Sequence, residues 1–202
     1  NDILTDKFKI AILTTSRSEF GLLKDVIIHI SKMTELTLFI GGNHLLDHSS
    51  LKEIQEFTKA INLKKIYLNT SVNIENNLTP LKQIKFIGGM AELLTKYFFE
   101  FKIDLLIILG DRWEILSAST AALLSRTPLA HISGGEITEG AIDESIRHSI
   151  TKMANLHFVA CEEYARNVNL MGEEDWRITI SGETGLDYIH NKKIIAFEDL
   201  KK

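Results

Sequence analysis

The chain has 202 residues, of which 45% are apolar and 25% are charged, and its formal net charge is −4 at pH 7. This length can bury the core of one globular domain, and the absence of a basic balance argues against nucleic-acid or anionic-lipid partners. No apolar stretch approaches the roughly 20 residues of a membrane span, and the first residues lack the pattern of a secretory signal.

The single cysteine, Cys161, excludes an intramolecular disulfide and is typical of a protein from a reducing cytoplasm. Because Cys161 comes at the end of an apolar run, we expect its thiol to be buried and inert. Neither internal repeats nor low-complexity linkers are evident, so the sequence predicts one domain with a lysine-rich tail over residues 190–202.

Short apolar runs alternate with segments of helical periodicity along the chain. The predicted strands cover residues 9–15, 36–40, 65–68, 105–109, 129–132, 156–160 and 177–180. The predicted helices cover residues 20–30, 51–61, 80–101, 113–125, 141–153 and 162–171. This alternation predicts an α/β domain with a parallel sheet, helices on both faces and right-handed crossovers.

Three positions carry signals for helix ends. Thr79 is a typical N-cap because Pro80 follows it at the first helical position. Ser18 is a plausible N-cap for the first helix, with Ser16 as its competitor. Gly172 is placed to terminate the helix that begins near residue 162.

Charged residues follow the fourth and fifth predicted strands at the points where these strands end. Asp111 and Arg112 come directly after the fourth strand, Glu136 follows the fifth, and Asp143 and Arg147 lie on the next helix. Ligands of open parallel sheets bind beyond the carboxyl ends of the strands. We therefore expect all five side chains to face one crevice.

Simpler structural roles remain open for these residues. Asp111 is also placed to cap the following helix, and Asp143 and Arg147, four residues apart, are spaced for an ordinary ion pair within their helix. His131 and His148 are candidate partners in the same polar network. No combination of His, Asp and Cys has a recognisable metal-ligand spacing, so we expect no metal site.

Two further residues follow the first two strands. Arg17 lies in the first strand-to-helix turn, where the free backbone N–H groups of a helix start would assist it in binding a phosphate. His44 follows two glycines and is a candidate ligand contact. A solvated turn arginine and a capping or surface histidine are the alternatives. Together these residues indicate an anion-accommodating site with carboxylates available for proton transfer, in either an enzyme or a binding domain for a charged sugar.

The block GDRWEILSASTAALLSRTPLAHISGGEITEGAIDESIRHSITKMANLHF, together with TTSRSEFGLLKDVI near the start and ISGETGLDYI near the end, resembles the hydrolysing UDP-N-acetylglucosamine 2-epimerases. The resemblance is closest to the NeuC-like bacterial branch that serves sialic and legionaminic acid synthesis. It implies one half of a GT-B enzyme, whose two Rossmann-like domains face each other across a cleft. Residues 1–202 would be the amino-terminal domain, and the carboxy-terminal domain is absent from this chain.

The resemblance also implies a reaction and roles for the residues. The sugar C2 proton is removed, UDP is eliminated, and water adds to give the free manno-configured sugar, with no cofactor, in an enzyme that forms a homodimer. Asp111 and Asp143 match catalytic carboxylates of the family, with Arg147 one turn on, whereas Arg17 and Arg112 match residues that contact the nucleotide phosphates. Guanidinium groups are suited to neutralise a diphosphate leaving group.

The sequence departs from the family pattern at Ser133, where many relatives carry a catalytic glutamate. Serine is a poor acid or base at neutral pH, so Glu136 is the nearest substitute for that step. The departure favours an unusual substrate such as UDP-N,N'-diacetylbacillosamine, or a catalytically inactive sugar-nucleotide-binding domain. Because the other domain is absent, we expect the isolated chain to be inactive. A glycosyltransferase half would share the fold but would not explain the carboxylates.

Overall fold

The computed structural model describes residues 7–72 and 78–186, so the predicted tail over 190–202 lies outside the described residues. Its seven strands form one sheet with the order β3-β2-β1-β4-β5-β6-β7, and every neighbouring pair is parallel. The strands are β1 (Lys9–Thr14), β2 (Glu35–Ile40), β3 (Lys64–Tyr67), β4 (Leu105–Leu109), β5 (Leu129–Ile132), β6 (Leu156–Val159) and β7 (Ile178–Ile180).

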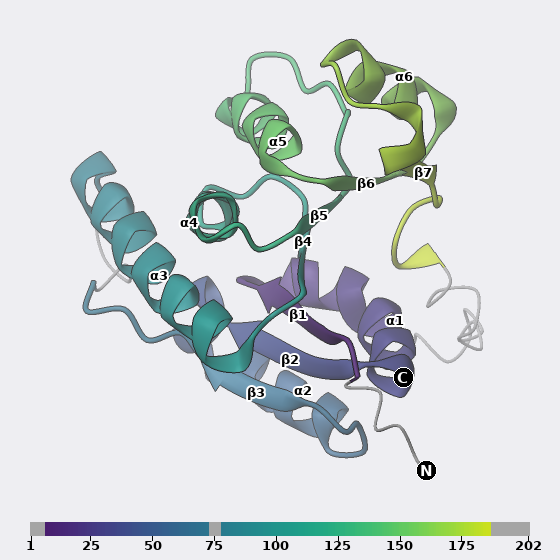
Figure 1. Cartoon of the computed structure of the whole chain (residues 1–202). Coiled ribbons are helices and arrows are strands. Elements are labelled where there is room, and N and C mark those ends of the chain that lie inside the picture. The colour runs from purple at the N-terminus through teal and green to yellow at the C-terminus, as the bar shows by residue number, and fades with distance from the viewer. Residues whose placement is uncertain (1–6, 73–77, 187–202) are drawn as a thin grey trace, which may run out of the picture.

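Helices cover both faces of this sheet, with α1 on one side and α3, α4 and α5 on the other (Figure 1). The helices are α1 (Arg17–Met33), α2 (His48–Thr58), α3 (Pro80–Phe101), α4 (Ile115–Ser125), α5 (Ile142–Met153) and α6 (Glu162–Leu170). Two short 3-10 helices cover Gly42–Leu45 and Asp175–Arg177. The predicted α/β architecture is confirmed. None of the helices in the described ranges is long and apolar enough to cross a membrane.

The alternation of side chains along each strand divides the core into two layers. Ala11 and Leu13 of β1 pack under α3 and α4, whereas Ile10 and Ile12 pack under α1 and α2. The same alternation runs through β4 and β5, so these strands are apolar on both faces, as central parallel strands must be. His131 of β5 is the exception, because it places an imidazole in the α3–α5 layer.

Several helix ends differ from the sequence prediction. Ser16, and not Ser18, caps α1, and it does so in a capping box with Glu19. Helix α4 begins at Ile115, two residues later than predicted, so Asp111 does not cap it. The structure confirms Thr79 as the N-cap of α3.

Cys161 is exposed, contrary to the prediction that its thiol is buried. Strand β6 already ends at Val159, and Cys161 has extended backbone at the N-cap of α6. The apolar run therefore ends before the cysteine, which lies at the surface between the strand and the helix.

The strand order reverses between β1 and β4. The chain leaves β1 through α1 toward β2, and it leaves β4 through α4, on the other face, toward β5. The two turns therefore diverge at the carboxyl ends of these strands, and this is the edge at which doubly wound sheets bind ligands. The residues after β1, β4 and β5 lie at this edge.

Candidate active site

Arg147 joins the ends of β4 and β5 at the predicted edge. Its Nη2 donates to Oδ2 of Asp111, and its Nη1 donates to the backbone oxygen of Glu136 at 2.8 Å and to Oγ1 of Thr138 at 3.2 Å. The Arg147 side chain is only 6% exposed, whereas that of Asp111 is 25% exposed. The buried guanidinium of Arg147 thus holds the Asp111 carboxylate at the end of β4, where this carboxylate is partly exposed to solvent.

Glu136 lies within the same group, partly buried above Arg147. Burial raises the pKa of its carboxyl group, and the charge of Arg147 opposes that rise without cancelling it. A carboxyl group with a raised pKa retains its proton to higher pH, so Glu136 is suited to donate one.

Asp143 is exposed in the first turn of α5 and does not form the intrahelical ion pair with Arg147 that the spacing left open as an alternative, because Arg147 pairs with Asp111. The pairing fails because Arg147 points inward, toward β4 and β5, while Asp143 lies at the surface. The charge of Asp143 nevertheless affects the pKa of Arg112. Burial lowers the pKa of that guanidinium, but Glu114, Glu19 and Asp143 together raise it above its usual value. Asp143 therefore lies close enough to Arg112 to contribute to the raised pKa.

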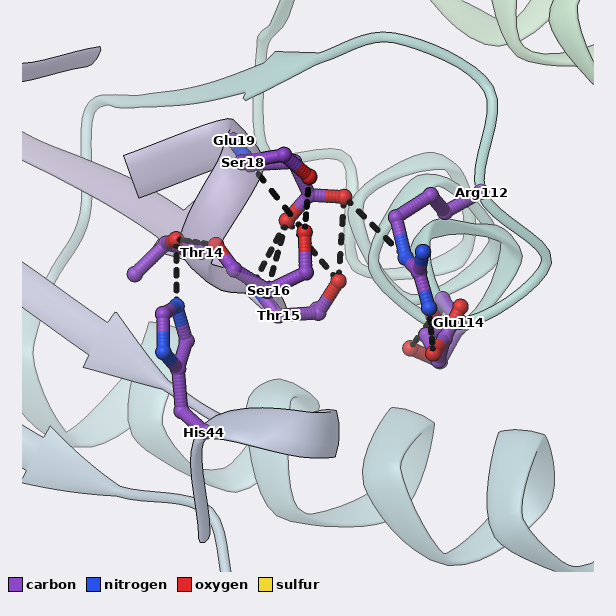
Figure 2. Close-up of polar contacts among 9 residues, drawn as sticks. Thr14, Thr15, Ser16, Ser18, Glu19, His44, Arg112 and Glu114 are labelled. Atoms are coloured by element: carbon purple, nitrogen blue, oxygen red, sulfur yellow. Dashed lines mark hydrogen bonds and ion pairs between the residues drawn. The ribbon is translucent and has the colours of Figure 1, made fainter. Parts of the chain in front are cut away.

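Arg112 lies between two buried carboxylates, as Figure 2 shows. Its Nη2 donates to Oε1 of Glu114 at 2.7 Å, and its Nε is 3.6 Å from Oε1 of Glu19. The Arg112 side chain itself is 34% exposed, so part of the guanidinium faces solvent. The two acids hold this cation between the turns that follow β1 and β4.

Glu19 organises the turn between β1 and α1. Its Oε2 accepts hydrogen bonds from the backbone N–H groups of Thr15 at 2.7 Å and Ser16 at 3.1 Å, and from Oγ1 of Thr15 at 2.8 Å (Figure 2). Burial raises the pKa of Glu19 to about 7, although the Thr15 hydrogen bonds and Arg112 oppose the rise. The sequence prediction missed both Glu19 and Glu114. The spacing of Ser16 and Glu19, a capping-box signature, was the available signal for the first.

Arg17 is exposed at the first position of α1 and pairs with Glu53 of α2, Nε to Oε2 at 2.8 Å. Lys24 contacts the other oxygen of the same carboxylate at 2.7 Å. An exposed pair of this kind contributes little to stability. Arg17 therefore retains the freedom to meet an anion at the helix start.

His44 is completely buried, contrary to the prediction that places it in contact with a ligand. Its Nε2 is 2.9 Å from Oγ1 of Thr14 (Figure 2). Its Nδ1 is 2.5 Å from Oγ of Ser50. Burial lowers its pKa to about 4, so the ring is neutral at pH 7. Both ring nitrogens are engaged, and His44 joins β1 to α2 inside the protein.

Ser133 adopts a φ of 64°, in the left-handed region that L-residues rarely occupy. The two glycines that follow it are buried, and Gly135 lies so close to α6 that a Cβ there would be 2.3 Å from the backbone oxygen of Tyr164. The loop thus packs closely between α5 and α6, and Asn167 of α6 donates a hydrogen bond to the backbone oxygen of Gly135. These contacts fix the path of the chain just before Glu136. Backbone conformations of this kind cluster at functional sites.

A cavity of about 320 Å³ lies elsewhere, on the α1 face of the sheet. Its walls are formed by side chains of α1, by residues of β4, β5 and β6 and by the segment over 181–185 after β7, and they include none of the predicted site residues. Within residues 7–72 and 78–186, no group of three or more His, Cys, Asp or Glu side chains is arranged to hold a metal ion.

Known proteins are similar to this chain in sequence and in fold. Residues 28–202 match the UDP-N-acetylglucosamine 2-epimerase family. The chain is 36% identical over 200 residues to the GDP/UDP-N,N'-diacetylbacillosamine 2-epimerase (hydrolyzing) of Campylobacter jejuni, with 97% of this chain and 50% of that protein covered. It is 32% identical over 189 residues to the UDP-N,N'-diacetylbacillosamine 2-epimerase (hydrolyzing) of Legionella pneumophila, with 92% and 48% covered.

Among solved structures, the UDP-GlcNAc 2-epimerase of Neisseria meningitidis bound to UDP-GlcNAc superposes with a TM-score of 0.73 at 17% identity, over 91% of this chain and 48% of that one. This likeness identifies the fold as one half of the GT-B type. The chain spans about half the length of the curated relatives it matches. The family match over residues 28–202 and the identity to these relatives show that the chain belongs to the UDP-N-acetylglucosamine 2-epimerase family.

Proposed function

We propose that this chain forms the amino-terminal domain of a hydrolysing UDP-sugar 2-epimerase and that a carboxy-terminal domain completes its active site. The observation that carries the proposal is the convergence of Asp111, Glu136 and Arg147 at one edge of the sheet, with Arg112 and Asp143 beside them. Three carboxyl groups and two guanidinium groups supply both the proton transfers and the anion stabilisation that the reaction needs.

The proposed reaction has two stages. A carboxylate takes the proton from sugar C2, the C–H electron pair forms the C1–C2 double bond, and the C1–oxygen bond breaks so that UDP leaves with its electron pair. Water then adds across the double bond, with hydroxyl at C1 and a proton at C2 on the opposite face, which gives the free epimerised sugar. We assign the proton transfers to Asp111, Asp143 and Glu136, with Glu136 as the donor because burial raises its pKa.

The arginines act on the leaving group. Arg112 follows β4 and Arg17 follows β1, and we propose that both bind the diphosphate of UDP. Negative charge grows on the bridging oxygen as the C1–oxygen bond breaks, and fixed guanidinium groups stabilise this charge at a small reorganisation cost.

For the substrate, we propose UDP-N-acetylglucosamine, with formation of N-acetylmannosamine for nonulosonic acid synthesis, or UDP-N,N'-diacetylbacillosamine. The second sugar is favoured by the names of the Campylobacter and Legionella relatives and by the presence of serine at position 133. Ser133 also favours a second candidate function, a sugar-nucleotide-binding domain without turnover.

Product analysis of the protein encoded by the complete reading frame tests these proposals, with residues 1–202 alone as the comparison. Each protein is incubated with both UDP-sugars, and free UDP and free sugar are measured. We expect the complete protein to release UDP and the epimerised sugar, and residues 1–202 alone to release none. Binding without UDP release by the complete protein would support the second candidate, and rapid release by residues 1–202 would refute the need for another domain.

A further inference from the structure

His131 is a buried histidine that the proposed chemistry does not use. It lies in the middle of β5 with none of its surface exposed. Its Nε2 is 2.8 Å from the backbone oxygen of Gly110, and its Nδ1 is 3.1 Å from Oγ1 of Thr151. Both ring nitrogens therefore have partners, one at the end of β4 and the other on α5.

These partners determine the tautomer of the ring. A backbone carbonyl only accepts hydrogen bonds, so Nε2 of His131 carries the proton and donates it to Gly110. Nδ1 is then the acceptor, and the Thr151 hydroxyl donates to it. Burial lowers the pKa of His131 to about 4, with His157 and Arg147 acting in the same direction. The neutral ring thus keeps one donor and one acceptor at pH 7.

The two partners of His131 are connected to the two residues of the ion pair. Gly110 immediately precedes Asp111 and has a φ of 81°, so the hydrogen bond to its carbonyl orients the peptide that carries Asp111. Thr151 lies four residues after Arg147 on α5, on the same face of the helix. His131 therefore fixes the elements from which Asp111 and Arg147 meet.

The loop after β5 packs on the same ring. A Cβ at Gly134 would be 3.1 Å from Nδ1 of His131 and 3.0 Å from Oγ1 of Thr151. The ring and the hydroxyl thus also define the path of the loop that leads to Glu136. All three segments of the proposed site contact this one imidazole or its partner.

We propose that His131 is a positioning residue for the epimerase reaction. Its ring, bonded between the Gly110 carbonyl and the Thr151 hydroxyl, sets the Asp111 carboxylate against the Arg147 guanidinium. This inference rests on the proposed function, because it concerns the geometry of the same site. His131 does not reach the substrate and acts only through Asp111 and Arg147.

Two amide substitutions separate the two hydrogen bonds of the ring. In His131→Gln the side-chain amide reaches the position of Nε2 and can still donate to Gly110. In His131→Asn the amide reaches only the position of Nδ1, so the bond to Thr151 is retained and the bond to Gly110 is lost. His157→Gln is the matched control, since His157 is the register partner of His131 on β6 and is equally buried, but bonds to Glu173.

In the complete protein with its UDP-sugar, we expect His131→Asn to lower kcat by about 10²-fold, the loss that a misplaced catalytic group produces, while KM stays close to that of the wild type. His131→Gln should retain most of the turnover, and His157→Gln should match the wild type. Normal turnover in a folded His131→Asn protein would overturn the proposal, as would equal losses in both His131 variants.

A spectroscopic measurement makes the inference independent of activity. The guanidinium N–H resonances of Arg147 report its contact with Asp111, and we expect slowly exchanging signals in the wild type and in His131→Gln but not in His131→Asn. Absence of UDP release from the wild type would refute the proposed function alone. Retention of the Arg147 signals in His131→Asn would refute the positioning role, whatever the activity.

Discussion

The carboxylate of Glu19 and the guanidinium of Arg112 lie 3.6 Å apart, Oε1 to Nε, and this contact joins the turns that follow β1 and β4. Glu19 also accepts hydrogen bonds from the backbone N–H groups of Thr15 and Ser16, so one buried acid fixes both turns at the strand reversal. Arg112, which we propose binds the diphosphate, is therefore held by the carboxylate of Glu19, and burying the charge of this carboxylate costs free energy.

The first prediction concerns the pH dependence of stability at Glu19. Its pKa is raised from 4.5 to about 7 in the folded protein, so the folded state binds more protons than the unfolded state between these values. The stabilisation from this group is complete below pH 4.5 and is lost as the pH rises through about 7, by up to about 3 kcal/mol. The stability of Glu19→Gln should not show this loss as the pH rises.

The measurement is urea unfolding of the wild type and Glu19→Gln between pH 4.5 and 7.5. The stability of the variant relative to the wild type should rise across this range. Glu92→Gln, at an exposed position of α3, is the control and should leave the pH slope unchanged. Parallel curves for the wild type and Glu19→Gln would contradict the raised pKa.

The second prediction concerns the compressed loop after β5. An alanine Cβ at Gly135 would lie 2.3 Å from the backbone oxygen of Tyr164 and 2.9 Å from Cγ2 of Val168, and φ there is 82°. We expect Gly135→Ala to lower the free energy of unfolding by about 3 kcal/mol or more, since steric clash adds to backbone strain.

Gly140→Ala separates the two causes, because Gly140 has a similar φ of 76° but open space around the added Cβ. Gly140→Ala should lower the free energy of unfolding by only about 1–2 kcal/mol, which is the backbone strain of a left-handed residue. Equal costs for the two alanines in thermal or urea unfolding would show that α6 does not press on the loop.

The third prediction concerns Arg17. Its side chain is 64% exposed and its pair with Glu53 contributes little to stability, so Arg17→Ala should leave the free energy of unfolding within about 0.5 kcal/mol of the wild type. If Arg17 binds the diphosphate, the KM for the UDP-sugar should rise by about tenfold, the equivalent of one lost charge-assisted hydrogen bond.

Lys59→Ala is the control for Arg17, because Lys59 also forms an exposed ion pair, with Glu56, at the far end of α2. Steady-state kinetics of the complete protein should show no change in KM for this variant. An unchanged KM in Arg17→Ala would remove Arg17 from the proposed diphosphate site.

The fold was predictable because central strands such as β1 and β4 are mainly apolar runs that end at glycine or polar residues. Strands β4 and β5 have the predicted bounds for this reason, and α3 begins at Pro80 as its Thr79 cap indicates. Buried strands leave little freedom in composition, so local sequence is a strong signal for them. The start of α4 was less predictable, because the turn residues before Ile115 also fit a helical pattern.

The candidate site was predictable only in part. Asp111 and Glu136 could be predicted because ligands of parallel sheets bind beyond the carboxyl ends of the strands. This expectation depends on the topology of the sheet and not on detailed packing. The sequence did not predict that Arg147 pairs with Asp111 in place of Asp143, because helical spacing does not reveal which side of α5 faces the sheet. The burial of His44 likewise follows from the approach of α2 to β1, a tertiary contact.

The most direct test of the proposed chemistry is Asp111→Asn in the complete protein, measured as UDP release and as binding of the same UDP-sugar. Asp104→Asn is the matched control, since Asp104 precedes the same strand at its opposite end and bonds to the backbone N–H of Lys9. We expect Asp111→Asn to lose at least about 10²-fold in kcat, with binding retained, and Asp104→Asn to turn over normally. Wild-type turnover in Asp111→Asn would contradict the catalytic role of this edge of the sheet.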